Sequence, residues 1–489
     1  MRLINAILST ALLLSLTACH SDHNNKTSMD ADSLNTELEG IWYSRDYGEI
    51  KQIEAETVTT LQVSNHACML AITIDPDALI SANHELTETG LLYQRPYDSA
   101  GVEYVRLDDI HQVCPEGMIT SAADGEDYVF DAQKVFSSFW HDMNTHYAFF
   151  KQRKINWEQI YSLYYDNLAG TSEEELKAVF SDILAQLKDG HTAVVLDFEG
   201  NDNDISFSTK PSLEEQLYQD AIELGFTEEQ RAPYVQEQLN RIVNNISDYL
   251  TDESKAEFLT RDNINQTNEE HNINWGIMEQ KGKRIGYLVL ENFINFDDHQ
   301  GIERTDITPY NRKFDHLIEK ILIQLTDTDE LILDIRNNGG GYDMQGLQLA
   351  RRFLTQEITA WNISVSYQGE LSFQKQVKAQ PHEGTRYLNP VSVLISPSTF
   401  SAAETFAMVM HNLPQVTMVG EETGGATSDT MPRLLPNHWF FNLSNEYYQD
   451  SEGNNYEIMG IQPDLKVAAY DPELRTQGRD SAIEAALHW

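Results

Sequence analysis

Residues 391–412 read VSVLISPSTFSAAETFAMVMHN, and this stretch decides the fold of the C-terminal half of the chain. Its first six residues are mostly apolar, which is typical of a buried strand. A Pro-Ser-Thr turn follows, and then a run of small and apolar residues that favours a helix over 401–412. The stretch therefore predicts a strand, a tight turn and a helix in direct succession.

The same alternation continues on both sides of this stretch. Further strands are expected at 284–293, 330–336 and 416–420, in addition to the one at 391–396, and a further helix is expected at 343–356. Alternating strands and helices are typical of an α/β core with a mainly parallel sheet.

Ser401 stands where the expected helix begins. A serine at that place lies in the positive end of the helix dipole, and the N–H of Ala402 is an unpaired donor of the first turn that can face a developing oxyanion. The alternative is that Ser401 only caps the helix, since serine is a common N-cap residue. The segment alone leaves both interpretations open.

A glycine run supplies a second candidate for the same site. Residues 334–341 read DIRNNGGG, directly after an expected buried strand. Glycines permit positive φ and close approach of the backbone to a ligand. The N–H of Gly340 is the expected second oxyanion donor, with Gly341 as the alternative, because the sequence does not settle the register within the run. The loop lacks the glycine patterns of nucleotide sites.

Three motifs in this order, DIRNNGGG, STFSAAE at 398–404 and VGEETGGA at 419–426, resemble the C-terminal processing peptidase family. That family includes the tail-specific proteases and the tricorn core protease. The looser resemblance extends from about residue 128 to 470. It implies a crotonase-like (ClpP-like) αβ superhelix and hydrolysis of peptide bonds by Ser401.

The family uses two catalytic arrangements. In a Ser–Lys dyad the lysine would fall at position 426, which is alanine here, and no lysine lies between Ser401 and Lys466. The other arrangement takes a histidine from LKDGHT at 187–192 and a glutamate from YEIMGIQPD at 456–464. The resemblance therefore implies a triad of Ser401, His191 and Glu457, in which imidazole takes the hydroxyl proton and the carboxylate orients the imidazole. Asp189 is interpreted as a helix-end residue.

The N-terminus indicates export. Residues 1–18 have the charge, the apolar run and the small terminal residues of a signal peptide, and LTAC at 16–19 resembles a bacterial lipobox. Cys19 is the expected lipidation site, and the polar residues 19–37 are expected to form a flexible tether. The protein is expected to be an exported lipoprotein on the periplasmic side of a membrane or at the cell surface, with the lipid as its sole membrane contact.

Composition divides the rest of the chain into four parts. Residues 38–120 are predicted to form a β-rich domain, and 121–198 a helical subdomain that ends in the His191 motif. Residues 199–275 are predicted to be an acidic helical insertion or lid, and 276–489 the peptidase core. Capping-box spacing marks helix starts at Thr171–Glu174 and at Ser212–Glu215.

The two remaining cysteines bear on the structure of the N-terminal domain, and the net charge bears on the possible partners. Cys68 and Cys114 are interpreted as one disulfide of the N-terminal domain, with two unpaired thiols as the alternative. A net charge of −43 excludes nucleic acid as a partner. Peptides or proteins are the expected substrates; no metal or cofactor is expected, and the oligomeric state is left open. The alternative function is a catalytically inactive family member that binds hydrophobic ligands or peptides.

Overall fold

The computed structural model describes residues 38–66, 68–74, 84–87, 90–93, 101–110, 113–114, 117–121, 128–196, 204–263, 273–294, 308–372 and 375–488. The signal segment, Cys19 and the tether expected at 19–37 lie outside these residues. Within them, no helix is both long and apolar enough to cross a membrane.

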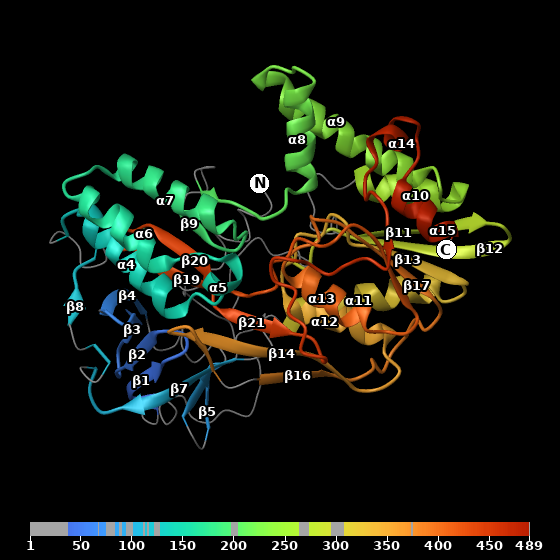
Figure 1. The fold of residues 1–489 in the computed structure, drawn as a ribbon. Helices are drawn as coiled ribbons and strands as arrows, with labels where there is room; N and C mark the ends of the chain where they lie inside the picture. The colour runs from blue at the N-terminus through green and yellow to red at the C-terminus, as the bar shows by residue number, and fades with distance from the viewer. Residues whose placement is uncertain are drawn as a thin grey trace.

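A six-stranded sheet forms the centre of the C-terminal half (Figure 1). In sheet order its strands are β11 (Ile273–Gln280), β12 (Lys283–Leu290), β13 (Glu330–Asp334), β17 (Val391–Ile395), β18 (Val416–Gly420) and β22 (Leu465–Lys466). The strands from β12 to β22 run parallel, and β11 closes one edge as an antiparallel hairpin with β12. The sheet is therefore mainly parallel, as the alternation of strands and helices predicts.

Helices cover both faces of this sheet, because the strands are apolar on both sides. Leu333 and Val393 pack with α11 (Thr308–Leu325), α12 (Asp343–Ala350) and α13 (Ala402–His411). Ile332 and Leu394 point to the other face, against α8 (Leu213–Glu223), α9 (Glu228–Ser247), α10 (Asp252–Asn263) and α15 (Ser481–His488).

A second layer pair lies beside this core. Helices α4 (Ala132–His146), α5 (Phe150–Arg153), α6 (Trp157–Tyr164) and α7 (Glu173–Leu187) pack on a sheet of order β10 (Ile205–Ser206), β9 (Ala193–Val195), β20 (Phe440–Ser444) and β19 (Thr430–Leu434). This sheet joins residues that follow α7 to residues more than 200 positions later. It places the His191 motif, which directly precedes β9, next to β20 of the C-terminal half.

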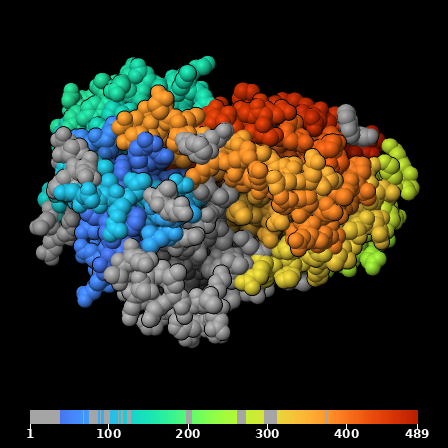
Figure 2. All heavy atoms as spheres, turned by 90° about the horizontal axis from the view of Figure 1, so that it is seen from below, coloured from blue at the N-terminus to red at the C-terminus, as the bar shows by residue number. Residues whose placement is uncertain are grey.

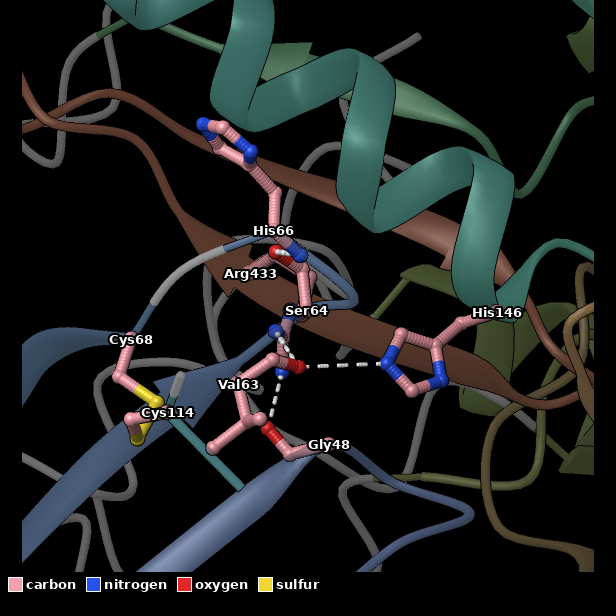
Figure 3. The surroundings of a disulfide bond; sticks show 8 residues. All are labelled: Gly48, Val63, Ser64, His66, Cys68, Cys114, His146 and Arg433. Atoms are coloured by element: carbon pink, nitrogen blue, oxygen red, sulfur yellow. Dashed lines mark hydrogen bonds between the residues drawn. A yellow bond between two sulfur atoms is a disulfide. The ribbon is translucent and has the colours of Figure 1, made fainter. Parts of the chain in front are cut away.

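The N-terminal residues form an eight-stranded sheet that lies against these helices. Its order is β5 (His84–Leu86), β6 (Leu91–Tyr93), β7 (Val102–Leu107), β1 (Gly40–Ser44), β2 (Glu49–Ile53), β3 (Val58–Val63), β4 (Cys68–Ile74) and β8 (Met118–Ile119). Cys68 and Cys114 are joined by a disulfide, which confirms the interpretation of this pair (Figure 3). In the view from below, blue atoms of this sheet lie directly against orange atoms of the C-terminal half (Figure 2).

A last small sheet connects the halves. β14 (Ile358–Tyr367) pairs with β15 (Glu370–Leu371), β16 (Lys375–Ala379) and β21 (Glu446–Gln449), and it extends from the core toward the helical subdomain (Figure 1). The chain thus has an α/β core, a helical part and an N-terminal β-rich part, which is the fold class expected from the sequence.

Several boundaries differ from the expected ones for local reasons. The capping box of α7 uses Ser172 and Glu175, one residue later than expected, because Ser172 is the residue with extended backbone at the helix start. The box at Ser212 and Glu215 is present as expected. The helix expected at 343–356 ends at Ala350 in a 3₁₀ turn, Arg351–Phe353. The insertion is helical in α8–α10, but its last residues, from Ile273, already belong to β11.

Candidate active site

Ser401 has an unusual backbone conformation at the carboxyl end of the core sheet. It lies between β17 and α13 with φ 57° and ψ −128°, and its hydroxyl makes no capping hydrogen bond to the helix. A positive φ costs a serine about 1–3 kcal/mol, and such strain is concentrated at functional sites. An N-cap serine has extended backbone and a bonded hydroxyl. The geometry therefore does not support the interpretation of Ser401 as a mere helix cap.

Contacts with the glycine loop hold the turn in this conformation. The N–H of Phe400 donates to the carbonyl of Asn338 at 3.0 Å, and the hydroxyl of Thr399 donates to the carbonyl of Ile335 at 2.8 Å. Gly340 lies so close to the turn that an added Cβ would stand 2.6 Å from Cβ of Ser401. A glycine is required at this position because any side chain would displace the serine.

Gly340, the expected oxyanion donor, already has a partner for its backbone N–H. Its N–H already donates to Oδ1 of Asn338 at 2.9 Å, since the asparagine side chain turns back over the loop, so it is not free for a ligand. In the described part of the chain, the N–H groups of Gly341 and Ala402 donate to no acceptor. The alternative position in the glycine run thus has the free donor.

His191 lies in a loop that begins where α7 ends. The C-cap residue Lys188 is left-handed, and Oδ1 of Asp189 accepts the backbone N–H of His191 at 3.0 Å. Oδ2 of Asp189 accepts the hydroxyls of Tyr147 and Thr192. Asp189 therefore stands at the end of α7, as expected, and its buried carboxylate also fixes the backbone of the His191 loop.

The imidazole of His191 is buried and next to the nucleophile turn. Its ring meets the ring of Phe400 edge-on, with 4.8 Å between centroids. Burial lowers the pKa of His191 to about 4; the charge of Asp189 opposes this shift and that of Arg153 adds to it. The ring is therefore neutral at pH 7 and can accept a proton. Among the described residues, Nδ1 is buried without a hydrogen-bond partner, and no hydrogen bond joins His191 to Ser401.

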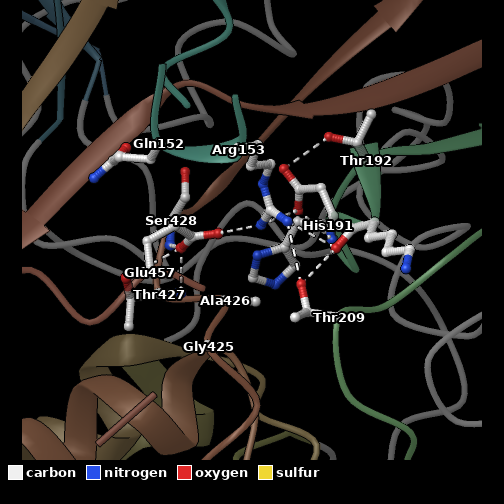
Figure 4. Close-up of polar contacts among 12 residues, drawn as sticks. Gln152, Arg153, His191, Thr192, Thr209, Gly425, Ala426, Thr427, Ser428 and Glu457 are labelled. Carbon is white, nitrogen blue, oxygen red and sulfur yellow. Dashed lines mark hydrogen bonds and ion pairs between the residues drawn. The ribbon is translucent and has the colours of Figure 1, made fainter. Parts of the chain in front are cut away.

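Glu457 reaches the same region but binds other groups (Figure 4). Oε1 accepts from Nη2 of Arg153 at 2.9 Å, and Oε2 accepts the N–H groups of Thr427 at 2.8 Å and Ser428 at 3.3 Å. Both carboxylate oxygens are therefore occupied by groups other than His191. Burial and the charge of Asp189 raise the pKa of Glu457 to about 8, and Arg153 partly offsets them.

Two charged residues of this site, Arg153 and Lys210, are not predicted by any motif in the sequence. Arg153 ends the short helix α5 and is one of 34 Lys and Arg residues, so no local signal distinguishes it. Lys210 comes from the insertion, and its Nζ donates to the carbonyls of Thr423 and Met459 at 2.5 and 2.8 Å. Only the tertiary fold brings these two side chains to the site.

The segment that would carry a dyad lysine is arranged differently. Buried Glu404 accepts the N–H groups of Gly425 and Ala426, at 2.8 and 2.7 Å, and the hydroxyl of Thr423. Lys466 pairs with Glu422 at the surface, at 2.9 Å. The described residues contain no group of three or more His, Cys, Asp or Glu side chains that could hold a metal ion.

Comparisons with known proteins agree with this geometry. Residues 284–467 match the model of Peptidase family S41. This part of the chain is therefore similar to peptidase family S41. Ser401, the glycine loop and Glu457 lie within the matched residues, whereas His191 and Arg153 precede them.

Two of the curated relatives are carboxyl-terminal-processing proteases. The chain is 26% identical over 186 residues to a carboxyl-terminal-processing protease of Picosynechococcus sp., which is 38% of this chain and 40% of that protein. It is 29% identical over 136 residues to a carboxyl-terminal-processing protease of Synechocystis sp., which is 28% of this chain and 30% of that protein. The chain thus matches less than half the length of these curated relatives.

A solved structure supports the fold. A Parabacteroides merdae protein assigned to the peptidases superposes with a TM-score of 0.54 at 24% identity. The superposition covers 74% of this chain and 96% of that one, so the fold likeness extends well beyond the matched S41 residues.

Proposed function

We propose that this protein hydrolyses peptide bonds, with Ser401 as the nucleophile, His191 as the general base and Glu457 as the carboxylate behind it. The observation that carries the proposal is the strained backbone of Ser401, whose hydroxyl is withdrawn from helix capping. A strained serine beside a glycine loop and a neutral, buried histidine has the parts that acyl transfer requires.

The parts act in sequence. His191 takes the proton of Ser401 as the hydroxyl attacks the peptide carbonyl, and it later gives that proton to the leaving amine. The N–H groups of Ala402 and Gly341 stabilise the oxyanion of the tetrahedral intermediate. Glu457 and Asp189 supply negative charge that offsets the imidazolium. The Ser–His and His–Glu hydrogen bonds form on substrate binding, since such bonds are often long or absent without substrate.

The proposed setting is the cell envelope. Residues 1–19 support export and acylation at Cys19, and peptides or proteins of the envelope are the proposed substrates. Cys19→Ser should move the protein from the membrane fraction to the soluble fraction and leave peptidase activity nearly unchanged, because the expected tether is flexible. Unaltered membrane association of the variant would contradict the lipid anchor.

A second candidate function is supported by the lack of a hydrogen bond between Ser401 and His191, both of which the structure describes. If Ser401 and His191 never engage, the fold serves as a binding module for peptides or hydrophobic ligands, because a fold alone does not determine function. A fluorophosphonate probe separates the two candidates, since it reacts only with an activated serine. We expect labelling of the wild type and no labelling of Ser401→Ala. An unlabelled wild type that binds peptides would replace the peptidase proposal with the binding module.

A further inference from the structure

Arg153 is a buried arginine that bonds two of the proposed catalytic segments at once. Its side chain is 4% exposed. Nη1 donates to the carbonyls of Leu187 at 3.1 Å and Lys188 at 2.8 Å, at the end of α7, where the His191 loop begins. Nη2 donates to Oε1 of Glu457 at 2.9 Å. One planar group therefore joins the backbone of the His191 loop to the carboxylate of Glu457 (Figure 4).

The charges around this arginine do not cancel when both neighbouring carboxylates are ionised. Oδ1 of Asp189 lies 3.8 Å from Nη2 of Arg153, so the guanidinium faces two buried carboxylates, those of Asp189 and Glu457. Two negative charges and one positive charge leave one excess negative charge next to His191. A buried excess charge is costly unless an opposite charge lies close to it. His191 supplies that opposite charge when it takes a proton and becomes an imidazolium.

We propose that Arg153 is a positioning residue of the proposed active site, whose guanidinium group holds the carboxylate of Glu457 against the His191 loop. The inference rests on the proposed function. Nη1 also donates to the hydroxyl of Thr209 at 3.2 Å, so the guanidinium fork reaches the insertion as well.

The ionisation of Glu457 gives a readout that a purely structural role would not change. The charged groups that face Glu457 are Arg153 from α5, Asp189 from the loop after α7, and Glu404 from α13. Both carboxylates raise the pKa of Glu457, and Arg153 lowers it. Without the guanidinium, Glu457 keeps its proton to a higher pH. If catalysis needs the ionised carboxylate, the ascending limb of the pH–rate profile must move to higher pH.

The experiment compares two substitutions in the full chain. Arg153→Met removes the charge and the fork, whereas Arg153→Lys keeps the charge and loses the fork. The rate of fluorophosphonate labelling is measured from about pH 5 to about pH 10, in steps of roughly half a unit, because one pH unit is a tenfold change in ionisation. Arg241→Met is the matched control, since Arg241 pairs with Glu237 on the exposed side of α9.

We expect Arg153→Met to lower the maximal labelling rate by about 100-fold, the typical cost of a misplaced catalytic group, and to move the ascending limb upward by about one pH unit or more. Arg153→Lys should lower the rate by about 10-fold and leave the limb nearly in place, because one ammonium cannot hold both carbonyls and the carboxylate. Arg241→Met should match the wild type.

Each outcome decides between the proposals. A wild type that is not labelled overturns the proposed function. A labelled wild type with an unshifted limb in Arg153→Met overturns the role of Arg153 alone. If Arg153→Met does not fold, Arg153→Lys decides: a wild-type rate in that variant shows that the fork is not needed, and a reduced rate with an unchanged circular dichroism spectrum supports it.

Discussion

Two buried arginines, Arg433 and Arg153, make similar hydrogen bonds but face different numbers of carboxylates. Arg433 on β19 donates to the carbonyls of Gly48 and Val63 and pairs with Asp142 at 2.6 Å. Figure 3 shows the N-terminal residues around it, with His146 beside them. Arg153 likewise bonds backbone carbonyls and a carboxylate, but it faces two carboxylates, those of Asp189 and Glu457.

The difference lies in the charge balance. Arg433 and Asp142 cancel, and burial lowers the pKa of the neighbouring His146 to about 3, so that the histidine stays neutral. The Arg153 group carries one excess negative charge next to His191 once Glu457 is ionised. In this protein the Arg433–Asp142 pair joins β19 to α4, whereas the excess negative charge beside Arg153 can offset an imidazolium at His191.

The largest expected effect is the loss of peptidase turnover when the proposed catalytic residues beside Arg153 are replaced. Ser401→Ala and His191→Ala should each reduce peptidase turnover by up to ~10⁶-fold, and the double variant should be little worse, because the two groups act as one unit. Turnover of a peptide library, read by mass spectrometry, measures this. Additive losses in the double variant would contradict a shared mechanism.

Glu457→Gln should reduce turnover on the order of 10⁴-fold, since the amide cannot offset the imidazolium. It should also change stability with pH. Burial raises the pKa of Glu457 from 4.5 to about 8, so the unfolded chain loses this proton first, and the folded state loses stability as the pH rises through that window. Denaturant unfolding at several pH values should show a smaller decline in Glu457→Gln than in the wild type. An equal decline would argue against the raised pKa.

Arg433→Met tests the balanced pair. Removing the cation leaves Asp142 buried without its partner, which should cost about 3–5 kcal/mol of the free energy of unfolding. Urea unfolding measures the loss. The labelling rate of the folded fraction should stay near the wild-type rate, because the contacts of Arg433 lie with the N-terminal sheet and Asp142. A large loss of labelling in folded protein would mean that the N-terminal contact also controls the chemistry.

The smallest expected effect concerns the lysine downstream of Ser401. Lys466→Ala should be nearly silent in turnover and should change stability by less than about 1 kcal/mol, because surface ion pairs such as that of Lys466 with Glu422 contribute little. If Lys466→Ala abolishes turnover while His191→Ala is tolerated, a displaced Ser–Lys dyad must replace the triad.

Local sequence was a good guide wherever local physics decides. The strand at Val416–Gly420 has its expected bounds, and the strands of the parallel core and helix α13 differ from theirs by a few residues at most. Periodicity of apolar residues determines such elements, and the shift of the α7 capping box by one residue is within that precision.

The contacts of the candidate site were harder to foresee. Arg153 and Glu457 are 304 positions apart, and the orientation of Asn338 that occupies the N–H of Gly340 depends on how the loop packs. Such pairings depend on which of many similar side chains the fold brings together, and a single sequence holds no record of that choice.

By itself, the sequence determined the α/β core, the strand–turn–helix that carries Ser401, the motifs that resemble the processing peptidases and the absence of a lysine at position 426. Only the tertiary structure decided the positive φ of Ser401, the free N–H of Gly341 in place of Gly340, and the joint hold of Arg153 on Glu457 and the His191 loop. The reason is physical: apolar periodicity and turn residues act over a few positions, whereas buried charges take their pKa values and partners from neighbours that are remote in the chain.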